Sequence, residues 1–162
     1  IFIFSGLIEL AETPEELAAV LAHEIAHAEE RHINSRIIRE VGVATLITIL
    51  TGGNSTLVID LAQKLVSADF SRTQEREADQ FAMHLLQKAG IHPANIGYFF
   101  ESLMAKEDVG SENLEFLSTH PHPHNRVDDA YDFPVSPDFV EIELNIDWQA
   151  VKDALNETST TD

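Results

Sequence analysis

Apolar residues recur every three or four positions over most of the chain, and this spacing predicts a mainly helical domain. The first long helix is expected to begin at Thr13, whose side chain can cap it, with Pro14 at the first helical position. Glu16 stands three residues after the cap, as in a capping box. The apolar pattern continues at helical spacing, and we expect this helix to extend to about Arg39.

The same spacing returns further along the chain and predicts more helices. Ser71 and Gln74 form a second capping box, which predicts a helix that runs to Lys88 and stops at Gly90. The remaining helices are expected over residues 57–66, over residues 94–106, over a short stretch near Pro123 that includes Arg126, and from Asp147 to Leu155.

Two segments have the pattern of strands. Residues Ile1–Leu7 are rich in β-forming side chains, and residues Val140–Ile146 alternate apolar and polar positions. Together they predict a small β-sheet. The expected fold is therefore mainly α with a small sheet, of the α+β class.

The charge of the chain is strongly unbalanced, with 28 acidic residues against 10 basic ones and a net charge of −18. Such a surface excludes a nucleic-acid partner and repels anionic membrane, because it cannot neutralise a row of phosphates. A solubilising acidic surface accounts for this charge, and a specific basic partner is the alternative. The chain has no cysteine, which excludes disulfides, thiolate zinc sites and a cysteine nucleophile.

The longest apolar run, Val41–Leu50, has ten residues and is followed by Gly52 and Gly53. A membrane span needs about 20 apolar residues, so we expect a buried helix or an interfacial segment here. The chain begins at Ile1 without a targeting segment, and we expect it to be a fragment of a longer protein.

His23 and His27 are four residues apart on the first long helix, which places both imidazoles on one face. Two imidazole nitrogens in that arrangement can bind one metal ion. Glu24 is rotated by about 100° around the helix, from where it can reach a water on the metal and act as a general base. The alternative is a polar helix face with two surface histidines. The apolar residues before His23 weaken that alternative, because unpartnered histidines on a buried helix would be costly.

A catalytic zinc site usually has three protein ligands and a water, so a third ligand must come from elsewhere. Residues 71–79 are dense in acids, and Glu75 and Asp79 share one face of the predicted helix. One of these two could bind the metal while the other orients a ligand. Glu77 should face away. The alternative is a solvated helix start, where acids favour the helix dipole.

Three blocks of the sequence resemble the family of zinc metallopeptidases that includes HtpX, BepA and the CAAX prenyl proteases. These blocks are residues 22–27, residues 70–79, and residues 119–121 together with Arg126. The resemblance covers roughly residues 1 to 130. It implies a zincin-like fold of the gluzincin type, with the metal-binding sequence on the active-site helix.

The resemblance also implies roles for individual residues of the site. It implies that Glu75 is the third ligand and that one Zn²⁺ is bound per chain. It also implies that Asp79 orients a metal ligand without binding the metal itself. For His120 it implies a place near the metal, as a fourth ligand that holds the enzyme inactive or as a group that stabilises the oxyanion. A structural role for His120 is a further alternative. Arg126 is expected to make an ion pair with an acid near the site, while His122 and His124 are expected to be solvated or to compete as the fourth ligand.

The function that follows is hydrolysis of peptide bonds in misfolded or envelope proteins by a zinc endopeptidase. The alternative is a latent or chaperone-like module that binds polypeptides and whose zinc is closed off by a fourth histidine. The resemblance is to the soluble, periplasm-type branch, which implies a periplasmic or envelope location and membrane association only through flanking segments. We expect a catalytic domain over residues 1–132 and a C-terminal extension over residues 133–162, with Ile1–Leu7 as the edge strand beside which a substrate could bind.

Overall fold

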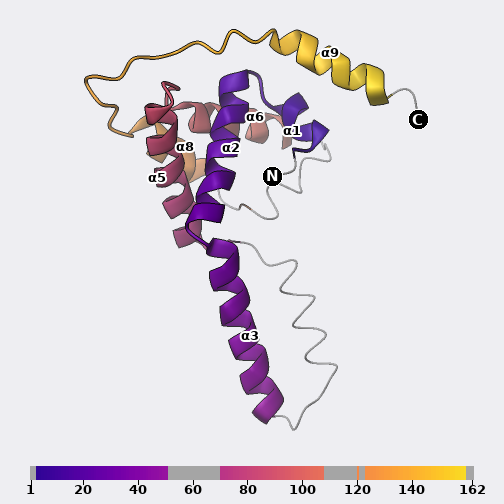
Figure 1. Cartoon of the computed structure of the whole chain (residues 1–162), viewed down its shortest axis with the longest axis vertical. Helices are drawn as coiled ribbons and strands as arrows, with labels where there is room; N and C mark the ends of the chain where they lie inside the picture. Colours follow the sequence, from indigo (N-terminus) through magenta and orange to yellow (C-terminus); the bar gives the residue numbers. More distant parts are fainter. Residues whose placement is uncertain (1–2, 51–69, 108–119, 121–122, 160–162) are drawn as a thin grey trace.

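The helices of the computed structural model carry most of the residues that it describes, which are 3–50, 70–107, 120 and 123–159 (Figure 1). In chain order they are α1 (Ser5–Leu10), α2 (Pro14–Glu29), α3 (His32–Leu50), α5 (Arg72–Lys88), α6 (Asn95–Glu107), α8 (Pro123–Tyr131) and α9 (Trp148–Ser159). The prediction of a mainly helical fold is confirmed.

Helices α2 and α5 lie side by side at the centre of the molecule, and their starts are set by local side-chain chemistry (Figure 1). At the start of α2, the Glu16 N–H donates to Thr13 Oγ1 at 3.1 Å. At the start of α5, the Ser71 N–H donates to Gln74 Oε1 at 3.1 Å and the Gln74 N–H donates to Ser71 Oγ at 3.3 Å. Both predicted N-caps are confirmed. They matter because these two helices carry most of the candidate site.

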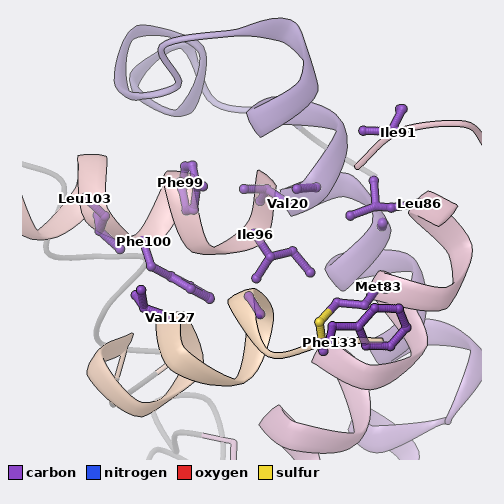
Figure 2. Packing of buried hydrophobic residues seen from close by; sticks show 14 of the residues in the cluster. Val20, Met83, Leu86, Ile91, Ile96, Phe99, Phe100, Leu103, Val127 and Phe133 are labelled. Carbon is purple, nitrogen blue, oxygen red and sulfur yellow. The ribbon is translucent and has the colours of Figure 1, made fainter. Parts of the chain in front are cut away.

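The hydrophobic core lies where α2, α5, α6 and α8 meet (Figure 2). Its largest side chains with less than 2% exposure include Phe99, Met83 and Leu103. Truncation of a phenylalanine to alanine in such a core costs about 3–5 kcal/mol, so this packing is a main source of stability. It holds α2 and α5 in a fixed relation to each other.

The predicted single helix from Thr13 to Arg39 is wrong, because the chain breaks between α2 and α3. Helix α2 ends at Glu29, and Arg31 then adopts a left-handed backbone conformation with φ 53°. Neither Gly nor Pro occurs here, and a tertiary contact holds the chain at the break. The carbonyl oxygen of His32 accepts a hydrogen bond from Gln74 Nε2 of α5 at 3.4 Å.

Helix α3 extends away from the other helices and contains the apolar run (Figure 1). The run is helical, as expected, but its described side chains are not buried: Val41, Leu46 and Ile49 are 51%, 61% and 71% exposed. The alternative of an interfacial segment stays a prediction. Over the described part of the chain, no helix is both long and apolar enough to cross a membrane.

The prediction of a small sheet is wrong for the residues that the structure describes, none of which is in a strand. Ser5–Leu10 is helix α1, so the proposed edge strand is lost over its second half, while residues 1–2 lie outside the described part. Residues 140–146 have no regular secondary structure, and Val140 and Ile142 are 75% and 56% exposed. Alternation alone does not make a strand without a neighbour to complete the ladder.

The C-terminal segment returns across the ends of α2 and α5. The Ile142 N–H donates to the Gly90 carbonyl at 2.7 Å, and the Trp148 indole N–H donates to the Ala11 carbonyl at 3.0 Å. Asp147 caps α9 as predicted, since its Oδ1 accepts from the Ala150 N–H at 3.1 Å. The division of the chain at residue 132 stays a prediction.

Two predictions fall outside the described residues. The first is the helix over residues 57–66. The second is the expectation for His122 and His124, whose side chains are not described. The short helix from Pro123 and the helix near residues 94–106 are confirmed as α8 and α6.

Candidate metal centre

Four buried side chains from distant parts of the sequence place a ligand-type atom within 4.8 Å of one another: His23, His27, Glu75 and His120. His23 and His27 come from one face of α2, and their Nε2 atoms are 2.9 Å apart. Glu75 reaches them from the first turn of α5, with Oε2 3.5 Å from His23 Nε2 and Oε1 3.3 Å from His27 Nε2. The i, i+4 spacing therefore places the two imidazoles side by side, and α5 brings the acid next to them; their role as metal ligands stays a prediction.

His120 faces this group with one ring nitrogen and the candidate base with the other. Its Nδ1 is 3.3 Å from His23 Nε2 and 3.1 Å from Glu75 Oε1. Its Nε2 is 3.3 Å from Glu24 Oε1. The Glu24 side chain is 36% exposed, whereas that of His120 is 6% exposed. His120 thus lies between the ligand group and a carboxylate that solvent can reach.

The shortest contacts between these donor atoms are close to the ligand spacing around a tetrahedral metal ion. Zinc typically makes bonds of about 2.0–2.1 Å to nitrogen and oxygen. In a tetrahedral site, such bonds place the ligand atoms about 3.3 Å from one another. The separations between the four side chains given above range from 2.9 Å to 3.5 Å. Imidazoles and a carboxylate without thiolates are a donor set that suits divalent ions of this class.

The charges of the group favour the metal-binding form of its acids. Burial acts to raise the pKa of Glu75, but hydrogen bonds from His120, His23 and His27 together with Arg126 lower it well below its usual range. Burial likewise opposes ionisation of Glu24, yet the His120 hydrogen bond and the nearby imidazoles leave its pKa lowered. Both carboxylates are therefore ionised at neutral pH.

The histidines are shifted in opposite directions. Burial lowers the pKa of His27, which favours the neutral ring that a metal requires. Burial also acts to lower the pKa of His120, but Glu24 and Glu75 outweigh it and raise that pKa to about 9. Without a metal, His120 is thus the group that carries the positive charge between the two acids.

Asp79 and Arg126 lie directly behind His23. Asp79 Oδ1 is 2.9 Å from His23 Nδ1, so that ring can donate its proton there and leave Nε2 free for a metal. Arg126 holds Asp79 with two bonds, Nε to Oδ2 at 2.6 Å and Nη2 to Oδ1 at 2.7 Å. Its Nη1 lies 2.6 Å from Glu75 Oε2, an ion pair without hydrogen-bond geometry. The guanidinium also lies over the Phe100 ring, with 4.2 Å from Cζ to the ring centroid.

Sequence reasoning missed two residues that touch the site. His32 is 4% exposed, and its Nδ1 is 3.0 Å from His27 Nδ1. Phe70 lies against His27 and His120, with ring centroids 4.0 Å and 5.3 Å apart. In an uninterrupted helix, residue 32 would lie about 140° around the axis from residue 27, so sequence spacing does not predict a contact between them. The contact forms because the helix breaks at Arg31. Phe70 had a weak signal, because it directly precedes the Ser71 cap.

The comparisons with known proteins agree with this geometry. The model of peptidase family M48 matches residues 1–132. The chain belongs to peptidase family M48. The predicted kinship with the BepA-type zinc metallopeptidases is confirmed, and with it the expectation of a metallopeptidase fold.

Relatives in family M48 include bacterial and mitochondrial proteases. The chain is 31% identical over 144 residues to the beta-barrel assembly-enhancing protease of Yersinia pestis, covering 80% of this chain and 29% of that protein. It is 32% identical over 126 residues to the metalloprotease LoiP of Escherichia coli, covering 74% and 49%. It is 31% identical over 133 residues to the mitochondrial metalloendopeptidase OMA1 of Schizosaccharomyces pombe, covering 78% and 39%. The chain thus spans less than half the length of each of these three family members.

Proposed function

We propose that the chain is the catalytic part of a zinc endopeptidase that cleaves proteins of the bacterial cell envelope. The observation that carries the proposal is the approach of Glu75 to His23 and His27. The His120 ring lies between this group and the ionised Glu24 carboxylate. The family and the names of its members support a peptidase. A relative named for assembly of β-barrels supports an envelope substrate.

The residues of the site divide the work of hydrolysis. His23, His27 and Glu75 would hold zinc, which when bound supplies a Lewis acid for the scissile carbonyl and lowers the pKa of water. Glu24 takes a proton from the attacking water and returns it to the leaving amine. Its lowered pKa keeps it in the ionised form that a base needs. Asp79 and Arg126 hold the His23 ring in its binding orientation.

The substrate is a polypeptide, and its preferred class follows from the charge of the chain. A net charge of −18 favours neutral or basic segments over acidic ones. The preference is modest, because charges further apart than about 8–10 Å are screened in physiological salt.

Replacing Glu24 with Gln tests the mechanism. The variant keeps the size of the side chain and cannot take up a proton, so zinc content should stay near that of the parent while casein cleavage falls by at least about 100-fold. Zinc is measured by elemental analysis and cleavage by release of labelled peptides. Exposed Glu9 replaced with Gln is the matched control. Cleavage by the Glu24 variant at the parent rate contradicts the assignment.

A second candidate, a latent form closed by His120, is favoured by one observation. His120 Nδ1 stands 3.3 Å from His23 Nε2 and 3.1 Å from Glu75 Oε1, which is the separation that a fourth ligand would have. A site with four protein ligands has no position left for water. An anomalous-difference map of the zinc-loaded protein distinguishes the two: three protein ligands and a water support the open enzyme, and four protein ligands support latency. In the open enzyme, His120 would stabilise the oxyanion instead.

A further inference from the structure

His32 is a buried histidine that the proposed mechanism does not use. It is the first residue of α3 and is 4% exposed. It contacts His27 from outside the group of candidate ligands. The two Nδ1 atoms are 3.0 Å apart and the ring centroids 5.0 Å apart. On its other side, His32 Nε2 is 3.3 Å from Glu77 Oε2, and the Glu77 side chain is 57% exposed.

These contacts fix where the protons of both rings must lie. His27 turns Nε2 toward His23 Nε2 and Glu75, so a metal there requires a lone pair on Nε2 and a proton on Nδ1. That proton has His32 Nδ1 as its acceptor. His32 must then carry its own proton on Nε2, where the Glu77 carboxylate accepts it. In this arrangement of protons, each contact has one donor and one acceptor.

The backbone is arranged to bring His32 to this position. Arg31 is the only residue other than glycine with a positive φ in the described part of the chain, at 53°. A left-handed conformation costs a residue with a Cβ about 1–2 kcal/mol, so it persists where the surroundings hold it. Gln74 Nε2 donates to the His32 carbonyl at 3.4 Å and ties this turn to the start of α5. The turn and Glu75 are thus tied to the same helix end.

We propose that His32 is a positioning residue that selects the tautomer of His27 and holds its Nε2 toward the metal. His32 does for His27 what Asp79 does for His23, with a neutral ring in place of a carboxylate. The inference rests on the proposed zinc site and adds a residue to it. Partners behind metal ligands typically contribute 10–100-fold to metal affinity, which sets the expected size of the effect at about that range.

The test compares two replacements of similar size. Asn places its Oδ1 where the His ring has Nδ1 and keeps the acceptor for His27, whereas Leu removes it. Zinc affinity is measured by competition with a chromophoric chelator, and the absorption spectrum of the Co²⁺-loaded protein serves as a second readout. His32→Leu should lose zinc affinity by about 10–100-fold with a changed Co²⁺ spectrum, while His32→Asn stays within about threefold of the parent.

The controls separate this role from a merely structural one. His84→Leu removes an exposed histidine of α5 that lies outside the candidate site and should leave zinc affinity unchanged. If His32→Leu does not fold, as judged by circular dichroism, His32→Gln replaces it, because Gln carries its amide one bond further out and loses the acceptor position. Equal affinities in the Asn variant and the Leu or Gln variant overturn the inference. A parent that binds zinc without cleaving casein contradicts the peptidase proposal only, and a parent that binds no zinc overturns both.

Discussion

At the scale of single residues, the site depends on one carboxylate that four groups share. Glu75 is 2% exposed and contacts the two candidate ligand histidines of α2, His120 and Arg126. Its pKa is lowered despite burial, so it offers a negative oxygen to a metal throughout the neutral range. Glu77, two residues later, is exposed and faces away from the ligand group, as the helical rotation predicts.

The pair Glu75→Ala and Glu77→Ala tests the choice of the third ligand. The Glu75 variant should lose zinc affinity by more than about 10-fold, because it removes the negatively charged ligand and leaves only neutral imidazoles near the ion. The Glu77 variant removes a carboxylate of the same helix turn that only supports His32, so it should lose affinity by no more than about 10-fold. Elemental analysis after dialysis measures both. A larger loss in the Glu77 variant would show that the wrong acid has been assigned.

At the scale of elements, the packing of the C-terminal segment on the end of α5 has a specific requirement at Gly90. The residue has φ 77°, and a Cβ there would lie 2.7 Å from Ile142 Cδ1. Its carbonyl accepts from the Ile142 N–H at 2.7 Å, so the two backbones cannot move apart without losing that bond. Glycine both ends the helix and admits the returning chain.

We expect Gly90→Ala to destabilise the folded protein by at least about 1–2 kcal/mol, from the left-handed backbone and the clash together. Urea denaturation of parent and variant measures the difference. Gly42→Ala is the matched control, since no described residue lies within 4 Å of its added Cβ and helix α3 should gain up to about 1 kcal/mol. Adding Ile142→Ala should recover only the part due to the clash. A Gly90 variant as stable as the parent would refute this account of the turn.

The elements that sequence reasoning found and missed differ in the range of the forces that set them. Caps at Thr13 and Ser71 act over three residues, so local sequence predicts them. The break at Arg31 has neither Gly nor Pro to mark it, and the contact beside it comes from Gln74, which is 42 positions from His32 along the chain. The same distinction separates the ligand pair of α2, which spacing predicts, from His32, which depends on the break.

At the scale of the whole molecule, the metal centre and the hydrophobic core are neighbours with separate sources of stability. The core of α2, α5, α6 and α8 is apolar, while most of the buried polar side chains in the described part of the chain gather at the candidate site, where Arg126 pairs with Asp79 and Glu75. Because these charges have partners among themselves, the domain can remain folded without a metal. A metal would add to its stability by mass action.

Removal of zinc with a chelator should therefore lower the thermal midpoint without loss of helical content at 25 °C. At free zinc 1,000-fold above the dissociation constant, binding stabilises the folded state by about 4 kcal/mol, and chelation removes that amount. Circular dichroism records both quantities. Glu75→Ala is the control, because its midpoint should respond little to the chelator. Unfolding of the parent at 25 °C on chelation would show that the core does not suffice.

The wide separation of the ligands along the chain also has a consequence for biosynthesis. His23 and His120 are 97 positions apart, and Glu75 lies between them. A chain leaving the ribosome carries two imidazoles on α2 long before the acid that completes the set emerges. Two ligands fall short of the three that a hydrolytic zinc site uses. With the proposed ligand set, the nascent chain would not complete the site until α5 has been made and has packed against α2.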